Sequence, residues 1–442
     1  METRVQIDWE NEQLSREEIL KIQDERLKDL LKRAWQHNPF YQRIWKQHGF
    51  SPGDVKSVAD ITKVPFVTKK DISDSMEQFP PFGDYQGDFH AVRIQASTGS
   101  TGKPKPIFHT QHDWDNITSL WARRLRAQGI GPDDIVQIAF AYTLFIVGFT
   151  STEGLMKLGA LVVPTGSGAI TPSERQLQTA RDWGVTGFGC TGSYMLRLGE
   201  VAKQMKLDPR NDFKIRISFH TAEPLTPEMR SDIQDMWGCK AYNNYGSVET
   251  GSPTYECAEQ NGLHISEDAY IFEVINPQTG EIVPDGEDGE LVVTTLFKEA
   301  APLIRYRIGD VTSFIPGACN CGRTFKQMSP IRGRVDDMMK IKGAAVYPTD
   351  FEPSIKKFPC FRPEYLIKVW KEGHKELVKL LVEYIGPDQE RIQYVERLAG
   401  DLHKALGLRC EVETVPQGEI SKLLDTEKRI KYKRILDLRK QG

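Results

Sequence analysis

The sequence has no excess of charge of either sign. Its 58 Lys and Arg residues face 61 Asp and Glu residues, which gives a formal net charge of -3. Such a balance excludes a general attraction to nucleic acid or to anionic lipid. We therefore expect neither a nucleic-acid partner nor a membrane partner, although the run from Lys428 to Arg434 is locally basic.

The sequence also lacks a long apolar run. Its most apolar stretch extends from Ile135 to Thr150 and is interrupted by Gln137 and Gly148. A membrane-spanning helix needs roughly 20 apolar residues, which this stretch does not supply. We interpret it instead as a buried strand followed by a helix.

Cysteine is sparse and odd in number, with 7 residues in a chain of 442. The first residues, "METRVQIDWENEQ", lack the basic start and apolar stretch of a signal peptide. Together these features argue against a disulfide framework and indicate a reducing compartment. The expected location is the cytoplasm.

The pattern of strands and helices predicts an α/β fold. The chain is longer than one core usually organises, so roughly two to three domains are expected. An N-terminal helical region, capped by Ser15, precedes short β-branched runs that alternate with helical stretches from about Val92. This alternation predicts crossover helices on a mixed or parallel sheet. Turn-rich strands after Gly262 predict an antiparallel β module, and the last hundred residues predict a small α+β domain.

Residues 96–105, "ASTGSTGKPK", combine glycines, hydroxyls and cations. Glycine allows close backbone approach, while amides, hydroxyls and an ammonium group donate to anionic oxygens, so the run is suited to phosphate binding. It is not a Walker loop, because Gly99 and Gly102 enclose only two residues and Pro104 follows Lys103. A flexible surface turn is the alternative interpretation of this composition alone.

Four motifs in a fixed order resemble the adenylate-forming superfamily of acyl-CoA synthetases and luciferases. They are "STGSTGKPK" (97–105), "NNYGSVET" (243–250), "YRIGD" (306–310) and "GRVDDMMKIKGAAVYP" (333–348). Further segments, including "TAEPLTPEMR" and "TTLFKEAAPLIRYRIGDVT", most resemble the phenylacetate-CoA ligase branch. The resemblance implies an AMP-binding domain over residues 1–335, a small mobile domain over 336–442 and a hinge at Asp336.

The resemblance also implies a reaction and its ATP site. A carboxylate is joined to AMP with release of pyrophosphate, and AMP is then exchanged for the thiol of coenzyme A. The implied phosphate-binding residues are Ser97, Thr98, Gly99, Ser100, Thr101, Gly102 and Lys103. Glu249 would hold Mg²⁺, a hard cation that prefers oxygen ligands. A solvated acid at the start of a helix is the structural alternative for Glu249.

Nucleoside recognition is implied for further positions. The adenine-binding residues would be Ala222, Glu223, Pro224, Asn244, Tyr245 and Gly246. Asp310 would accept from the ribose hydroxyls and Arg334 would contact the ribose or phosphate. A core tyrosine and a simple turn aspartate are the alternatives for Tyr245 and Asp310. Lys431, in "IKYKRILDLR", matches the catalytic lysine of adenylation, although Ile430 replaces the usual glycine; a charged surface edge is its alternative.

The acid pocket is implied by "IAFAYTLF" (138–145), with Phe140 and Phe145 as walls, and by His220, Thr221 and Tyr245. Aromatic walls favour an aryl acid, while ordinary core packing is the alternative. His220 and Thr221 depart from the Phe-Gly common in the family, so arylacetic, benzoic and bicyclic acids all stay open.

Cys257, His264, Cys319 and Cys321 form a further pattern. Three thiols and one imidazole make a closed tetrahedral set for structural Zn²⁺, although the spacing is not the standard C-x-x-C. Buried cysteines that act as small hydrophobic residues are the alternative.

The expected activity is therefore that of an aryl carboxylic acid-CoA ligase, whose partners are a small aromatic acid, ATP and coenzyme A, with a homodimer as one option for assembly. An adenylating transferase with another acceptor is the alternative function. A non-catalytic nucleotide-binding protein would be expected to lose Glu249, Asp310 or the terminal lysine, and all three are present.

Overall fold

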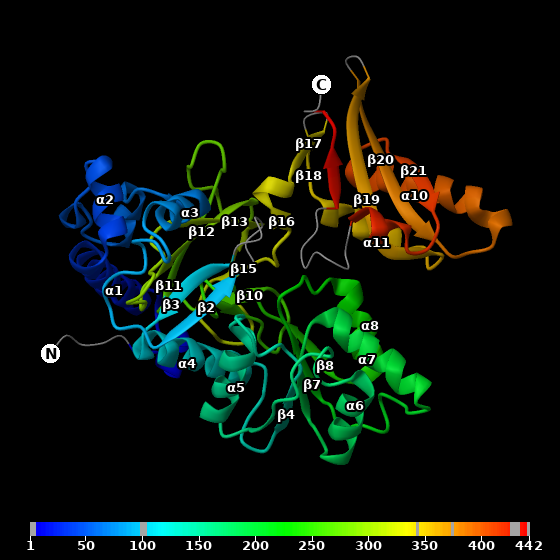
Figure 1. The fold of residues 1–442 in the computed structure, drawn as a ribbon, viewed down its shortest axis with the longest axis horizontal. Coiled ribbons are helices and arrows are strands. Elements are labelled where there is room, and N and C mark those ends of the chain that lie inside the picture. Colours follow the sequence, from blue (N-terminus) through cyan, green and yellow to red (C-terminus); the bar gives the residue numbers. More distant parts are fainter. Residues whose placement is uncertain (1–5, 98–103, 342–343, 373–374, 425–433, 440–442) are drawn as a thin grey trace. The chain divides into compact units, whose positions relative to one another are not determined.

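The computed structural model describes residues 6–97, 104–341, 344–372, 375–424 and 434–439. The chain divides into two compact units (Figure 1). The first comprises Met1–Ile308 and Thr312–Ile331, and the second comprises Gly309–Val311 and Arg332–Gly442. The predicted α/β fold, with a large N-terminal and a small C-terminal part, is confirmed. The exact boundary after residue 335 stays a prediction.

Helices open the first unit, as the sequence predicts. α1 (Arg16–His37) begins at a capping box in which Ser15 accepts from the backbone of Glu18 and the Glu18 side chain bonds back. α2 (Pro39–Gln47) follows directly, because the side chain of Asn38 caps its first turn. The apolar faces of the two helices contribute to the main core, where Leu27 and Trp45 are fully buried.

A parallel sheet forms the next part, in the order β5-β4-β6-β7-β8. Its strands are β4 (Ile135–Ile138), β5 (Leu161–Val163), β6 (Gly187–Gly189), β7 (Ile217–His220) and β8 (Lys240–Asn243). The helices between them are α5 (Val147–Lys157), α6 (Ser173–Asp182), α7 (Gly192–Gln204) and α8 (Pro227–Trp237). The predicted alternation is confirmed, and the apolar stretch from Ile135 is a buried strand followed by a helix. The loops at the carboxyl ends of β7 and β8 lie at one edge of the sheet.

Two further sheets follow. One has the order β1-β13-β12-β11, with β16 (Gly333–Arg334) also paired to β13, and the other is antiparallel with the order β14-β15-β10-β9. The strands of the first are β1 (Val67–Thr68), β11 (Tyr270–Ile275), β12 (Gly289–Thr295) and β13 (Tyr306–Thr312). Those of the second are β9 (Thr254–Tyr255), β10 (Leu263–Ile265), β14 (Phe314–Ile315) and β15 (Gln327–Met328). The predicted antiparallel module after Gly262 is thus confirmed.

The second unit is a small α+β domain, as expected. Its sheet has the order β21-β20-β19-β22, in which the long pair β19 (Phe361–Glu372) and β20 (Lys375–Tyr384) is antiparallel. β21 (Glu411–Val415) and β22 (Ile435–Asp437) add in parallel. The unit also contains α9 (Glu352–Lys356), α10 (Arg391–Leu406), α11 (Glu419–Leu424), β16 (Gly333–Arg334), β17 (Met339–Ile341) and β18 (Ala344–Val346).

Among the residues that the structure describes, no helix combines the length and apolarity needed to cross a membrane.

Candidate active site and metal centre

The predicted phosphate loop joins the two strands of a hairpin. β2 (Arg93–Ser97) and β3 (Lys105–His109) are antiparallel, and Ser97 pairs with Lys105. Thr98, Gly99, Ser100, Thr101, Gly102 and Lys103 lie outside the described residues, as does Lys431. The structure therefore places Ser97 at the base of the loop and leaves the roles of the other seven residues as predictions.

Lys105, the first residue of β3, was not among the site residues predicted from the sequence. Its side chain is buried, and its ammonium group donates to the hydroxyl of Ser73 and, at 3.4 Å, to the carbonyl of Lys69. Burial and the charge of Lys69 lower the pKa of Lys105, while the Glu249 carboxylate opposes this shift. In the strand "KPIFH", buried and partly buried side chains alternate, and Lys105 is on the buried side. The alternation of strand residues could therefore have identified Lys105 as an inward-facing cation.

Glu249 lies in the loop that follows β8 and is half-buried. This loop is rigid: Ser247 and Thr250 exchange backbone-to-hydroxyl hydrogen bonds of 3.0 and 3.1 Å. A Cβ atom at Gly246 would lie 2.3 Å from the carbonyl oxygen of Gly251, so only glycine fits there. The negative charge of Glu249 contributes to the raised pKa of Tyr85 and opposes the lowering of the pKa of Lys105 and of Lys298.

The segment predicted to bind adenine, residues 222–224, follows β7 and is fixed by a hydrogen bond to α7. The carboxylate of Glu223 accepts from the backbone N–H of Ser193 at 2.6 Å, at the start of α7. Ala222 adopts a positive φ of 75°, a conformation that L-residues rarely take outside constrained loops. The side-chain oxygen of Asn244 accepts from Gln128 at 2.7 Å, and its nitrogen donates to the carbonyl of His220 at 3.3 Å.

The predicted ribose-binding pair lies within the second unit. Asp310 of β13 is opposite Arg334 of β16 in an antiparallel register, and their side chains form an ion pair of 2.6 Å. Gly309 has φ +81, and a Cβ atom there would lie 2.9 Å from the Arg334 guanidinium. The Asp310 carboxylate is thus positioned by the arginine proposed to act with it. Asp336 follows in a short 3-10 turn, Val335–Asp337.

The predicted acid-pocket residues lie at the end of β7 and in the loops that follow β4, β7 and β8. Phe140 and Thr221 are buried, while Phe145 and Tyr245 are partly exposed. The imidazole of His220 is fully buried, with Nδ1 3.1 Å from the carbonyl oxygen of Cys190 and Nε2 2.9 Å from the Ser218 hydroxyl. Burial lowers the pKa of His220 to about 4, so the ring is neutral. Its ring nitrogens thus serve internal hydrogen bonds.

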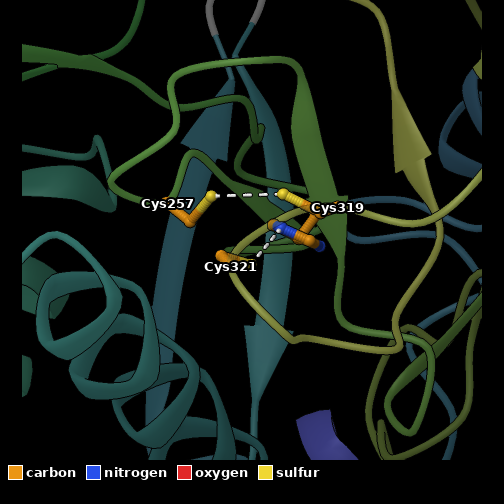
Figure 2. Close-up of side chains that lie close together, drawn as sticks. Cys257, Cys319 and Cys321 are labelled. Atoms are coloured by element: carbon orange, nitrogen blue, oxygen red, sulfur yellow. Dashed lines mark hydrogen bonds between the residues drawn. The ribbon is translucent and has the colours of Figure 1, made fainter.

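The predicted Cys and His set comes together in the antiparallel module. Cys257 follows β9, His264 is on β10, and Cys319 and Cys321 lie between β14 and β15. The four ligand atoms all lie within 4.8 Å of one another. Figure 2 shows the sulfur of Cys257 facing that of Cys319, at 3.7 Å. Two thiolates on tetrahedral zinc, with Zn–S bonds near 2.3 Å, are separated by roughly 3.8 Å, so the geometry fits this metal.

The Nε2 atom of His264 faces the cysteines of this cluster and can act as a metal ligand. Its Nδ1 lies 3.1 Å from the carbonyl oxygen of Phe325 and therefore carries the proton, whereas Nε2 lies 3.4 Å from the Cys321 sulfur. Such a carbonyl partner fixes the tautomer of a metal-binding imidazole. Burial also lowers the pKa of His264 to about 4, so its ring is neutral. Buried and neutral, the imidazole offers a free electron pair to the center of the four groups.

The N-terminal segment packs against this module through Glu12. The buried Glu12 carboxylate accepts from the Tyr255 hydroxyl at 2.6 Å and forms an ion pair with Arg323, whose Nε lies 3.0 Å away. The Glu12 carbonyl accepts from the backbone of Thr324 at 2.9 Å. Arg323 comes two residues after Cys321, so Glu12 contacts the segment that carries two cysteines of the cluster.

Two family models match parts of this chain. A family model described as AMP-binding enzyme matches residues 55–296, and another described as AMP-binding enzyme C-terminal domain matches residues 343–439.

Two curated relatives match nearly the whole chain. The phenylacetate-coenzyme A ligase of Aromatoleum evansii is 36% identical over 433 residues, which cover 94% of this chain and 96% of the relative. That of Thermus thermophilus is 35% identical over 452 residues, covering 98% and 99%. A solved structure of 2-hydroxyisobutyryl-CoA ligase, in the postadenylation state with R3-HIB-AMP, superposes with a TM-score of 0.87 at 27% identity and covers 99% of this chain and 96% of that one.

Proposed function

Because the chain belongs to the AMP-binding enzyme family, we propose that it is an AMP-forming aryl carboxylic acid-CoA ligase. The observation that carries this proposal is the end-to-end match, at 35 to 36% identity, to relatives named phenylacetate-coenzyme A ligase. In the first step a carboxylate oxygen attacks the α-phosphorus of ATP and pyrophosphate leaves. In the second, the coenzyme A thiol attacks the acyl carbon and AMP leaves.

The phosphates of ATP would be bound by the loop of the β2–β3 hairpin and, through Mg²⁺, by Glu249. The hydroxyls of the loop and Lys103 would offset the charge that develops on the leaving pyrophosphate. Glu249 offers a half-buried carboxylate oxygen, the donor type that Mg²⁺ prefers, so this residue fits the metal. Bound Mg²⁺ would supply further charge neutralisation. Lys105 would add a further cation to this end of the site, since it is buried at the first position of β3, directly after the loop.

The nucleoside end would be bound by the segment 222–224 with residues 244–246, and by the Asp310–Arg334 pair. An ionised carboxylate has two acceptor oxygens, which suits the ribose diol. The ion pair of 2.6 Å supports this role, since Arg334 fixes the orientation of the Asp310 carboxylate. Asp336 would be the hinge, because hinges are a few element-terminal residues that absorb backbone change.

The acid would bind against Phe140, Phe145, Thr221 and Tyr245, with His220 as a buried support. Both ring nitrogens of His220 already lie within hydrogen-bond distance of Cys190 and Ser218. We therefore propose that His220 supports the wall of the acid pocket and does not contact the carboxylate of the substrate. Aromatic walls favour an aryl acid by stacking and burial.

The test is a panel of aryl and aliphatic acids assayed for AMP release with and without coenzyme A. We expect at least one arylacetic or benzoic-type acid to give acid-dependent exchange of labelled pyrophosphate into ATP, and a thioester when coenzyme A is added. Exchange without any thioester would favour the alternative, an adenylating transferase with a different acceptor. Absence of exchange with every acid would contradict the whole assignment.

We also propose that the cluster of Cys257, His264, Cys319 and Cys321 holds a structural Zn²⁺. The separations support this, as does the chemistry of three thiols and one neutral imidazole. A closed set of four protein ligands leaves no open position, so the metal would stabilise the antiparallel module and take no part in the reaction.

All seven cysteines are free, which supports a reducing cytoplasm as the location. A homodimer stays a proposal.

A further inference from the structure

One face of α4 (Gln111–Ala127), continued by its C-cap, supports the loop that follows β8. The residues of this face are spaced by about one helical turn and are Ile117, Trp121, Arg124 and Gln128. A Cβ atom at Gly251 would lie 3.1 Å from the Ile117 side chain, so the helix packs directly against the loop. At the other end of the face, the amide of Gln128 donates to the side-chain oxygen of Asn244 at 2.7 Å.

Arg124 is a buried cation on this face that the proposed mechanism does not use. Its side chain is 1% exposed, and burial lowers its pKa to about 9. The neighbouring Arg123 pairs with the carboxylate of Asp268, whereas no ion pair between described residues includes Arg124. A methionine of similar length would fill the same space without a buried charge. The guanidinium group therefore needs an explanation other than packing.

The contacts of Arg124 supply that explanation. Its Nη2 atom donates to the carbonyl oxygen of Thr254 at 2.6 Å and to that of Tyr245 at 3.2 Å. Its guanidinium group lies over the Trp121 ring, 4.2 Å from the centroid, and this stacking fixes the plane of the group. Tyr245 lies just after β8, and Thr254 is the first residue of β9. Arg124 therefore joins the two ends of the loop 244–253.

The middle of this loop has supports of its own. Ser247 and Thr250 exchange hydrogen bonds, and the hydroxyl of Tyr270 donates to the carbonyl of Thr250 at 2.7 Å. These contacts hold the turn that carries Glu249 without help from the guanidinium group. Loss of that group is therefore expected to displace the start of the loop more than Glu249.

We propose that Arg124 is a positioning residue of the nucleotide site, which holds the Tyr245 carbonyl and thereby sets the Tyr245 ring and the Asn244 amide against the adenine of ATP. This inference rests on the proposed function of residues 244–246. Because Arg124 is fully buried, it acts only through this segment and touches no substrate. The proposal explains why a guanidinium group is retained where an apolar side chain would avoid a buried charge, since stability is commonly sacrificed at functional sites.

The experiment compares the wild type with Arg124→Met and Arg124→Lys, using an acid that supports pyrophosphate exchange in the wild type. We expect Arg124→Met to raise the KM for ATP about tenfold, because the lost hydrogen bonds serve nucleoside binding. The KM for the acid, and the Mg²⁺ concentration that gives half-maximal rate at saturating ATP, should change less than about twofold. Arg124→Lys keeps a donor for the carbonyls, so its KM for ATP should lie between those of the wild type and Arg124→Met.

Arg123→Lys is the matched control, because Arg123 is the adjacent buried arginine of α4 and pairs with Asp268 rather than with the loop. It should lower the melting temperature, since lysine cannot reproduce the bidentate pair, and should leave the KM for ATP within about twofold of the wild type.

Three results would overturn the proposal: an unchanged KM for ATP in both Arg124 variants, an equal rise in the KM for ATP and for the acid, or the same rise in the KM for ATP in Arg123→Lys. If Arg124→Met does not fold, Arg124→Lys alone must show the selective rise, and its absence there refutes the role. If the wild type itself never exchanges pyrophosphate, the proposed function fails instead.

Discussion

At the scale of single residues, the first unit is held together by charged groups that are removed from water. Arg123 on α4 and Asp268 are both fully buried and form two parallel hydrogen bonds of 2.7 and 2.8 Å. Asn11 adds a third donor to the same carboxylate at 3.0 Å. A buried ion pair contributes little when compared with an apolar pair, but the loss of one partner leaves an uncompensated charge. The pair therefore makes the position of the N-terminal segment depend on a single carboxylate.

We expect Asp268→Asn to destabilise the protein by about 3 kcal/mol at neutral pH, since Arg123 stays buried without its counter-charge. Urea unfolding measures the difference. The exposed Asp74→Asn, which removes a surface partner of Lys70, is the control and should change stability by less than about 0.5 kcal/mol.

The pH dependence of the Asp268 effect has a definite sign. Burial alone would raise the pKa of Asp268, but Arg123 and Arg26 outweigh it, so the folded pKa is lowered. The stabilisation is therefore complete above the unfolded-state pKa and is lost as the pH falls through the folded-state value. The difference between wild type and Asp268→Asn should shrink in strong acid. A small difference that is constant with pH would contradict this account.

At the scale of elements, the sequence predicts type and order well where the pattern is local. Each predicted strand and helix between Ile135 and His220 is present, because β-branched runs and amphipathic spacing are properties of neighbouring residues. The meeting of Cys257 and His264 with Cys319 and Cys321 could also be expected from chemistry, since two segments each supply a pair of ligand types. Lys105 and Lys298 could not be placed in this way. Their burial depends on contacts between segments far apart in the chain, such as that of Lys105 with Lys69 and Ser73.

The antiparallel module carries a prediction of its own. Protein purified without chelators should contain about one zinc per chain, because four protein ligands close the site. Cys321→Ser should reduce this content and lower the melting temperature by roughly 5 °C or more, since metal binding contributes folding free energy.

Cys360→Ser is the matched control, because Cys360 is a partly buried thiol of the second unit that is not in the cluster. It should keep its zinc. Metal-free wild-type protein, or equal zinc content in the two variants, would rule out the assignment.

At the scale of the whole molecule, the two units have separate cores. The second has its own, with Phe351, Tyr365 and Leu398 fully buried. Independent cores would allow one unit to change its position while both keep their packing. The hinge at Asp336 was inferred from the family resemblance, because no local pattern alone would locate it, and it stays a prediction.

If the second unit supplies the adenylation lysine, Lys431→Ala should reduce pyrophosphate exchange by at least about 100-fold, because it removes a cation from the developing charge of the transition state. Thioester formation from supplied acyl-adenylate should be spared. Both rates are measured on the same preparation. Lys428→Ala and Lys433→Ala, in the same basic run, are the matched controls and should retain exchange. Equal loss of the two half-reactions in Lys431→Ala would refute the role.

The network around Glu12 has a practical consequence for anyone shortening this chain. A version that begins after residue 13 would leave the Tyr255 phenol and the Arg323 guanidinium without the carboxylate they share, immediately next to the thiol cluster. The β9 strand and the segment that carries Cys319 and Cys321 would then lose a buried carboxylate that contacts both. Truncation after residue 13 should therefore weaken the very module that holds the four candidate zinc ligands.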